Sequence, residues 1–246
     1  MGALQGHLDG AYRTISNLHI TDMSNIGQSV GLFRVNIGSI KNLHVQAHIS
    51  IPDDTIYDRW VGVFAGVNRG TIINCSSGVM DGKDYMLENY SRNTYVGGIS
   101  GISNGGRIEY CGNLGRIYSM GNTGGITGAC DFGGIIMYSS NNGAISYDIK
   151  QSFTFTHASQ NRSIGGIVGR NYNGFIEECI NRGLIQYMGG SSSSTILQPH
   201  IGQIIGYGAT FPNSGNTWIG SVNSGNLTWV GNHNQALYVG NRERGR

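Results

Sequence analysis

A six-residue glycine cassette recurs six times along the chain, and it constrains the fold more strongly than any other feature of the sequence. The copies are VGLFRV (30–35), VGVFAG (61–66), VGGISG (96–101), TGGITG (123–128), IGGIVG (164–169) and IGQIIG (201–206). Their first glycines are separated by 31, 35, 27, 41 and 37 residues, so a constant unit alternates with insertions of variable length. Such a recurrence is typical of solenoids, propellers and other repeat architectures.

A second block follows the cassettes and reads aliphatic, two variable residues, Cys or Ser, any residue, Asn, any residue, Gly. The Cys-or-Ser slot holds Cys75, Cys111, Ser139, Cys179 and Ser221, and Leu43 replaces them in the first copy. Two residues further on, four copies place Asn113, Asn141, Asn181 and Asn223. Small side chains can repeat in a narrow interior, and stacked Asn amides can hydrogen-bond from one repeat to the next. We therefore predict that these residues form an inward structural ladder.

Each unit of roughly 22 to 25 residues contains short alternating apolar runs broken by glycine and asparagine, a pattern typical of strands and tight turns. A propeller blade needs about 40 to 45 residues, which is more than this unit provides. We predict one all-β domain over residues 1–246, a right-handed parallel β-helix (β-solenoid) of about seven coils with loop insertions. The predicted repeats cover about 30–51, 61–80, 96–120, 123–149, 164–188 and 201–230, after a partial opening coil at 5–20.

Charge and hydropathy exclude two classes of partner. The net charge is +2 and no dense basic run occurs, so the electrostatic footprint of a nucleic-acid binder is missing. No apolar stretch approaches the roughly 20 residues that span a bilayer, so we expect no membrane insertion. The first residues lack the charged and apolar regions of an export signal. The chain is therefore expected to be either cytoplasmic or a fragment of a longer exported protein.

The cassettes, together with the block G-x-I-x-x-C-x-N-x-G-x-I, resemble the GLUG motif of bacterial secreted and surface proteins over about residues 5 to 230. The opening LDGAYRTISNLHI (8–20) is similar to the coil that often precedes such repeats. GLUG repeats occur in adhesin-like proteins and in the non-catalytic part of IgA-cleaving metallopeptidases. The resemblance implies a β-helical solenoid at the cell surface or outside the cell. It implies no catalytic residue and no cofactor, and it points to a host glycan or an extracellular protein as partner.

Long insertions leave the repeats at a similar phase, at about 51–60, 81–95, 150–163 and 189–200. Loops grouped on one side of a rigid scaffold are the usual place for recognition. Four aromatic residues lie in or beside these insertions and are the candidate binding contacts: Trp60, Tyr85, Tyr90 and Tyr95. By contrast, Tyr147, Tyr187 and Trp229 share the parity of inward aliphatic residues, which favours core packing over a sugar-stacking platform.

A carbohydrate-cleaving enzyme is the main alternative, because β-helical scaffolds commonly support glycan cleavage by paired carboxylates. Asp58 and Asp84 belong to acidic loops that we expect to leave successive coils at equivalent points, which makes both residues binding or catalytic candidates. Solvated loop charges are the competing interpretation. Glu177 and Glu178 are adjacent on a predicted strand and so face opposite sides.

No metal or cofactor site is predicted, since the four cysteines form no C-x-x-C pair and small buried thiols explain them better. The sequence therefore favours a non-catalytic binding, adhesion or spacer module, with no catalytic residue assigned. A polysaccharide hydrolase or lyase is the first alternative. A self-assembling structural repeat is the second.

Overall fold

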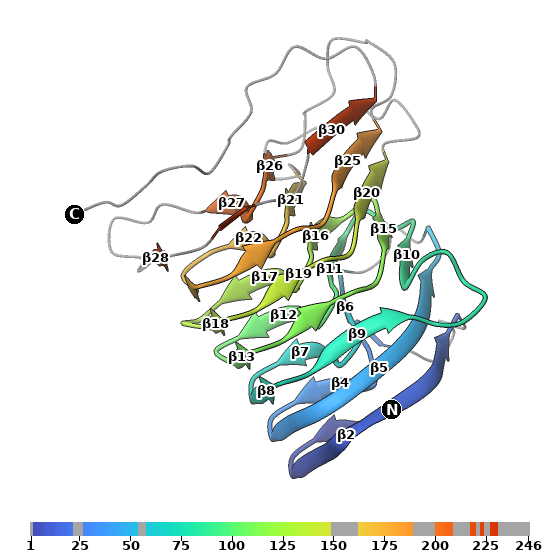
Figure 1. Ribbon diagram of the computed structural model, residues 1–246, viewed down its shortest axis with the longest axis vertical. Helices are drawn as coiled ribbons and strands as arrows, with labels where there is room; N and C mark the ends of the chain where they lie inside the picture. Colours follow the sequence, from blue (N-terminus) through green and yellow to red (C-terminus); the bar gives the residue numbers. More distant parts are fainter. Residues whose placement is uncertain are drawn as a thin grey trace.

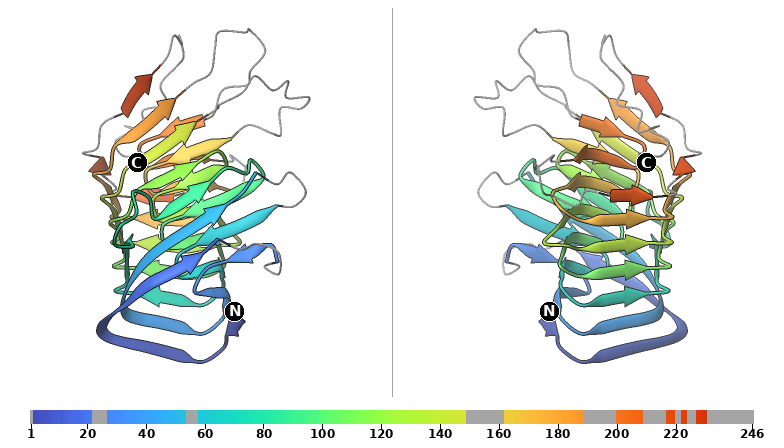
Figure 2. Two further views of the ribbon diagram at one scale, coloured as in Figure 1. Left: turned by 90° about the vertical axis from the view of Figure 1, so that its right-hand side faces the viewer. Right: turned by 90° about the vertical axis from the view of Figure 1, so that its left-hand side faces the viewer.

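The computed structural model describes residues 2–21, 27–53, 58–148, 162–188 and 200–208, together with short strands at 217–219, 222–223 and 227–230. Within these residues the protein is all-β, and its strands form three sheets. None of the described segments is a helix that could cross a membrane. The strands are stacked one above another from the N-terminal to the C-terminal repeats (Figure 1). Two side views show the same layered stack (Figure 2).

Each repeat passes through the three sheets in the same order. The strand that opens the glycine cassette belongs to the first-arm sheet, which contains β3 (Ser29–Val30), β6 (Arg59–Gly62), β11 (Thr94–Gly97), β16 (Asn122–Gly124), β21 (Ser163–Gly165) and β26 (His200–Gly202). The strand that closes the cassette belongs to the second-arm sheet, which contains β1 (Ala3–Leu4), β4 (Phe33–Asn36), β7 (Ala65–Asn68), β12 (Ser100–Asn104), β17 (Thr127–Asp131), β22 (Val168–Asn171) and β27 (Ile205–Gly208).

The rest of each repeat lies in a large third sheet. Its early members are the long strands β2 (His7–Ile20) and β5 (Ser39–Ile51). The later members are β8 (Thr71–Ile73), β9 (Ser76–Val79), β10 (Leu87–Asn89), β13 (Arg107–Glu109), β14 (Gly112–Asn113), β15 (Ile117–Ser119), β18 (Ile135–Met137), β19 (Ser140–Asn141), β20 (Ile145–Asp148), β23 (Phe175–Glu177), β24 (Ile180–Asn181), β25 (Ile185–Met188), β28 (Thr217–Ile219), β29 (Val222–Asn223) and β30 (Leu227–Val230). Three short strands of one repeat thus pair with successive parts of a single long strand of the neighbouring repeat, as β8, β9 and β10 do with β5.

Strands of successive repeats pair in parallel, and their equivalent residues lie side by side except at two register shifts between β2 and β5. In the first-arm sheet Val61 lies beside Val96, and Val96 lies beside Thr123. The large sheet likewise aligns Ile72, Ile108 and Ile136, which are all fully buried. The structure is therefore a β-helix-like solenoid, as the repeat pattern predicted.

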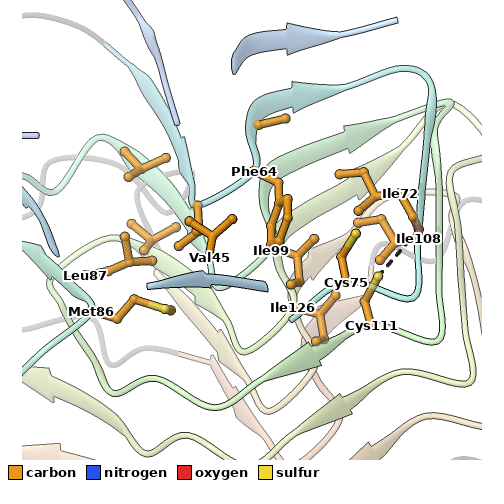
Figure 3. Close-up of a cluster of buried hydrophobic side chains, with 14 of the residues drawn as sticks. Val45, Phe64, Ile72, Cys75, Met86, Leu87, Ile99, Ile108, Cys111 and Ile126 are labelled. Atoms are coloured by element: carbon orange, nitrogen blue, oxygen red, sulfur yellow. Dashed lines mark hydrogen bonds between the residues drawn. The ribbon is translucent and has the colours of Figure 1, made fainter. Parts of the chain in front are cut away.

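The core lies between the sheets and is built from columns of aliphatic residues. The fourth cassette residue supplies one column, which includes Phe64, Ile99 and Ile126, and the aliphatic residue that opens the second block supplies another, which includes Ile72 and Ile108 (Figure 3). Successive strands lie about 4.8 Å apart, so each residue of a column packs on its equivalents in the neighbouring repeats. Every repeat buries its apolar residues against its neighbours, as expected of a solenoid.

The glycines of the cassette stand where no side chain fits. A Cβ atom on Gly101 of β12 would collide with the Val61 nitrogen of β6 and would lie 2.6 Å from the Trp60 carbonyl carbon. A Cβ on Gly97 would collide with the Ser100 carbonyl oxygen and lie 2.5 Å from the Thr127 Cα. Real Cβ contacts are essentially never that short. The strands of the two arm sheets therefore approach each other backbone to backbone.

The asparagines of the second block form a buried ladder of amides. Asn113 Nδ2 donates to Asn141 Oδ1 at 2.7 Å, and Asn141 Nδ2 donates to Asn181 Oδ1 at 2.8 Å. Asn181 Nδ2 in turn donates to Gln203 Oε1 at 3.1 Å. On the N-terminal side of the ladder, Ser77 donates to Asn113 Oδ1 at 3.2 Å. β29 places Asn223 in register with Asn181, whereas Ser221 lies outside the described residues.

Each ladder amide also closes the Asn-x-Gly turn of its own repeat. Asn113 Oδ1 accepts the Gly115 N–H at 3.0 Å, and Asn113 Nδ2 donates to the Gly115 carbonyl at 3.0 Å. The second glycine of the cassette packs directly on these amides, in the pairs Gly98 with Asn113, Gly125 with Asn141 and Gly166 with Asn181. The two sequence blocks are thus two halves of one packing unit.

The Cys-or-Ser slot forms a second buried column beside the ladder. Leu43, Cys75, Cys111, Ser139 and Cys179 are all buried in it. The polar members donate to the carbonyl two residues earlier, as Cys179 Sγ does to Glu177 at 3.3 Å and Ser139 Oγ does to Met137 at 2.8 Å. The residue between donor and acceptor is in the left-handed region, with φ of 48° at Glu178 and 51° at Tyr138. Thiol and hydroxyl interchange because both are small donors that reach this carbonyl, whereas Leu43 fills the slot of the first copy by packing alone.

We predict that Asn141→Ala lowers the free energy of unfolding by about 3 kcal/mol, because it leaves the buried Asn113 amide and the Gly143 carbonyl without their partner. Urea unfolding followed by circular dichroism measures the change. The matched control is Asn142→Ala, the adjacent exposed asparagine, which is expected to change stability by less than about 0.5 kcal/mol. Equal losses in the two variants would show that the ladder is not a main stabilising element.

Candidate functional site

The structure distributes the predicted aromatic binding residues over two sheets. Trp60 on β6 and Tyr95 on β11 are neighbours in register on the first-arm sheet, and both are half-buried. Tyr85 and Tyr90 flank the short strand β10 in the large sheet and are also half-buried. The sequence predicted these four residues as one set of loop contacts. In the structure they belong to two different sheets.

The first group, which we call the tyrosine cluster, consists of Tyr85, Tyr90 and Tyr118. The ring centroid of Tyr118 lies 5.8 Å from that of Tyr85 in an edge-on arrangement and 5.3 Å from that of Tyr90 at a tilt. β10 pairs with β15 so that Glu88 lies beside Tyr118. This pairing brings the two loop tyrosines onto a ring that projects from a regular strand.

Polar contacts hold the tyrosine cluster in place. The Tyr118 hydroxyl donates to Asp148 Oδ2 at 3.0 Å, and both residues are buried. Burial first, and then the hydrogen bond to Asp148, raise the pKa of Tyr118, so the phenol stays protonated. The guanidinium carbon of Arg116 lies 4.8 Å from the Tyr85 ring centroid. His48 Nδ1 is 3.2 Å from the Tyr85 carbonyl oxygen, which fixes the backbone at the same point.

Tyr90 stands at the edge of this cluster. Burial, with the nearby Glu88 carboxylate as the second cause, raises the pKa of Tyr90 above that of a free tyrosine. Sequence reasoning missed Tyr118 and Asp148, because both belong to repeat strands rather than to insertions. The signal that could have found Tyr118 is its register with the outward-facing Glu88.

The second group, which we call the Arg170 cluster, consists of Tyr95, Arg170, Tyr172, His200 and Tyr207. The Tyr95 and Tyr172 hydroxyl oxygens lie 3.5 Å apart although 77 residues separate them in the chain. The Arg170 guanidinium lies over the rings of Tyr172 and Tyr207. The ring centroids of His200 and Tyr207 are 5.0 Å apart. Burial, and then the charge of Arg170, lower the pKa of His200 and favour its neutral form.

The acidic candidates lie at different points of their repeats. Asp58 is exposed directly before β6 of the first-arm sheet, whereas Asp84 is exposed before β10 of the large sheet. The sequence suggested that the two loops leave successive coils at equivalent points. They do not, because the insertion at 81–95 contains a strand of its own that pairs with β5 and β15. In the described ranges no group of three or more His, Cys, Asp or Glu is arranged to hold a metal ion.

The four cysteines are buried thiols that form no disulfide with one another. Burial raises the pKa of Cys179 to about 12 and also raises the pKa of Cys111 and Cys130. Cys111 Sγ donates to the Glu109 carbonyl at 3.1 Å in the same manner as Cys179. A buried, protonated thiol is a poor nucleophile and a poor metal ligand. Cys111, Cys130 and Cys179 therefore fill the core, and Cys111 and Cys179 also cap the corner of their repeats. A hydrogen bond with Cys111 lowers the pKa of Cys75.

We predict that wild-type stability falls between pH about 9 and about 12 and that Cys179→Ser removes the part of this loss that comes from the Cys179 thiol. The native state holds the Cys179 proton up to a pKa of about 12, whereas an unfolded thiol ionises near its ordinary value. The contribution is thus complete below pH about 9 and is lost as the pH rises above it, at up to about 1.4 kcal/mol per pH unit.

Urea unfolding of both proteins in reductant, at pH 7 and pH 10.5, checks this. Ser139 already occupies the same slot, so Cys179→Ser should differ from wild type by no more than about 1 kcal/mol at pH 7. An identical alkaline loss in the two proteins would assign the pH dependence to other groups.

No protein-family model matches the sequence, and no curated protein matches it. Among solved structures, the chain is similar to the crystal structure of a "putative immunoglobulin A1 protease" from Bacteroides ovatus, with a TM-score of 0.60 and 19% sequence identity. The similarity covers 93% of this chain and 64% of the Bacteroides ovatus protein, so the chain spans less than two thirds of that protein's length. Identity at this level shows a common fold and carries no activity with it.

Proposed function

We propose that this chain is a non-catalytic binding or adhesion module of a bacterial surface or secreted protein, acting outside the cell. In this proposal the repeats are GLUG-type units, wound as a right-handed parallel β-helix of about seven coils. The handedness follows the chirality rule for parallel crossovers. A host glycan or an extracellular protein is the expected partner.

The tyrosine cluster is the observation that carries this proposal. Tyr85 and Tyr90 are half-buried, and their rings rest on the buried Tyr118. Asp148, Arg116 and His48 fix the cluster from three sides. Pre-ordered aromatic side chains lose little conformational entropy when a ligand packs on them, and their hydroxyls add hydrogen bonds. Such a surface on a rigid stack suits recognition.

A polysaccharide hydrolase or lyase is the less favoured function. A hydrolase would need two carboxylates flanking one scissile bond, about 5 to 9.5 Å apart in glycosidases. Asp58 and Asp84 belong to different sheets and are both exposed. The name of the Bacteroides ovatus protein adds immunoglobulin A1 as a ligand to be tested, for binding and for cleavage alike.

We predict that the immobilised chain retains at least one member of a panel of polysaccharides, host matrix proteins and immunoglobulin A1, and that the retained ligand stays intact. The double variant Tyr85→Ala, Tyr90→Ala should weaken retention at least about tenfold, since a well-packed interface aromatic contributes about 1.4 kcal/mol or more. Retention is measured by surface plasmon resonance and integrity by mass spectrometry. The matched control is Tyr12→Ala, which removes a ring that is 78% exposed and lies on β2, away from both clusters.

Cleavage of a ligand would contradict the proposal, and Asp58→Asn with Asp84→Asn would then test the enzyme alternative. Light scattering over a range of protein concentrations tests the third possibility. Growth of large particles without any ligand would favour a self-assembling structural repeat.

A further inference from the structure

Arg170 is held by aromatic rings rather than by an acid. Its guanidinium carbon lies 5.1 Å from the ring centroid of Tyr172 and 5.1 Å from that of Tyr207. No carboxylate of the described residues forms an ion pair with it, and its buried Nε has no hydrogen-bond partner there. A positive charge that is partly removed from water normally finds an anionic partner. Within the described residues, Arg170 therefore lacks the anionic partner that such a charge normally has.

The fold sets the position of these groups. β22 and β27 pair so that Arg170 lies beside Tyr207 on adjacent strands, and Tyr172 directly follows β22. The first-arm sheet contributes Tyr95, whose hydroxyl meets that of Tyr172, and His200, whose ring meets that of Tyr207. Both arm sheets thus converge on one half-buried group of rings around a single guanidinium.

The neighbouring charges also favour an anion. Burial lowers the pKa of Arg162, and the positive charges of Arg92 and Arg170 add to that effect. The charge of Asp131 contributes to raising the pKa of Tyr172. Asp131 Oδ1, however, accepts the Phe132 N–H at 2.7 Å, and the carboxylate makes no ion pair with Arg170. The surroundings of Arg170 are therefore positive overall, and a bound anion would relieve the repulsion between the arginines.

The geometry selects the kind of anion. The guanidinium carbon lies over two aromatic rings, which contribute no hydrogen-bond acceptor to its N–H groups there. A carboxylate is planar and can accept two of these N–H bonds at once. The ring surfaces of Tyr172, Tyr207 and Tyr95 suit the apolar faces of a sugar better than a flexible peptide.

We propose that the Arg170 cluster binds the carboxylate of an acidic sugar, with Arg170 as the bidentate donor and the tyrosines beside it as the surface for the sugar ring. This inference rests on the proposed binding function and assigns it a ligand class. The acidic sugar is either an internal uronate of a polysaccharide or a terminal sialate, and the same carboxylate chemistry serves both.

The test is isothermal titration calorimetry with two matched pairs of probes, oligogalacturonate with its methyl ester and sialyllactose with lactose. The two members of the first pair differ only by the free carboxylate, and those of the second pair only by the acidic sugar that carries it. We expect the acidic member of one pair to bind and its neutral partner to bind at least about tenfold more weakly, because charge-assisted bidentate pairs contribute about 1.5 to 3 kcal/mol. Which pair responds distinguishes an internal uronate from a terminal sialate.

Arg170→Gln should weaken the acidic probe at least about tenfold, while Arg170→Lys should fall between this variant and wild type, since an ammonium keeps the charge but not the planar fork. The matched control is Arg182→Gln, which removes the same charge from an exposed position outside the cluster and should bind as wild type does. Thermal unfolding establishes that the variants are folded. If Arg170→Gln does not fold, Arg170→Lys alone decides the outcome.

Equal binding of acidic and neutral probes would overturn the inference, and so would an equal loss in Arg170→Gln and Arg182→Gln. Failure of both acidic probes to bind, or tighter binding of oligoglutamate than of either sugar, would overturn it as well. A panel ligand that is lost with Tyr85→Ala, Tyr90→Ala but unaffected by Arg170→Gln would leave the proposed function intact and remove only this site.

Discussion

The close approach of backbone to backbone at the glycine cassettes is the constraint on which the rest of the structure depends. The arm strands meet at distances that exclude even a methyl group, as at Gly97 and Gly101. The turn within each cassette also places the second glycine against a buried Asn amide, as Gly98 lies against Asn113. The Asn ladder can therefore form only if the two arms close, and its hydrogen bonds then keep successive repeats in one register.

This register determines where the surface clusters form. Stacking brings Tyr95 within 3.5 Å of Tyr172 and sets Arg170 beside Tyr207, although these residues lie far apart in the chain. The loop tyrosines are positioned in the same way. Because β10 pairs with β5 on one side and β15 on the other, Tyr85 and Tyr90 lie against Tyr118. The scaffold thus converts a one-dimensional repeat into two compact groups of rings.

The sequence predicted the repeat well because the glycine cassette recurs in six copies and the Asn-x-Gly turn in four. The glycine cassette and the Asn-x-Gly block were each visible, and they indicated an all-β parallel solenoid. Their mutual contact was not visible, since only the closed turn brings Gly98 onto Asn113. The clusters were harder to predict. Arg170 and Tyr118 occupy variable slots of the repeat, and only their neighbours across the sheets, Tyr207 and Asp148, give them a distinct environment.

The most direct test compares two glycines, Gly101 and Gly112, neither of which has a positive φ. We predict that Gly101→Ala lowers the free energy of unfolding by about 3 kcal/mol or more, since its Cβ would collide with β6 and force the arms apart. Gly112→Ala should change it by less than about 1 kcal/mol, because the nearest atoms to its Cβ are 3.9 Å away. Equal stability of the two variants in urea unfolding would contradict the claim that the glycine contacts hold the solenoid together.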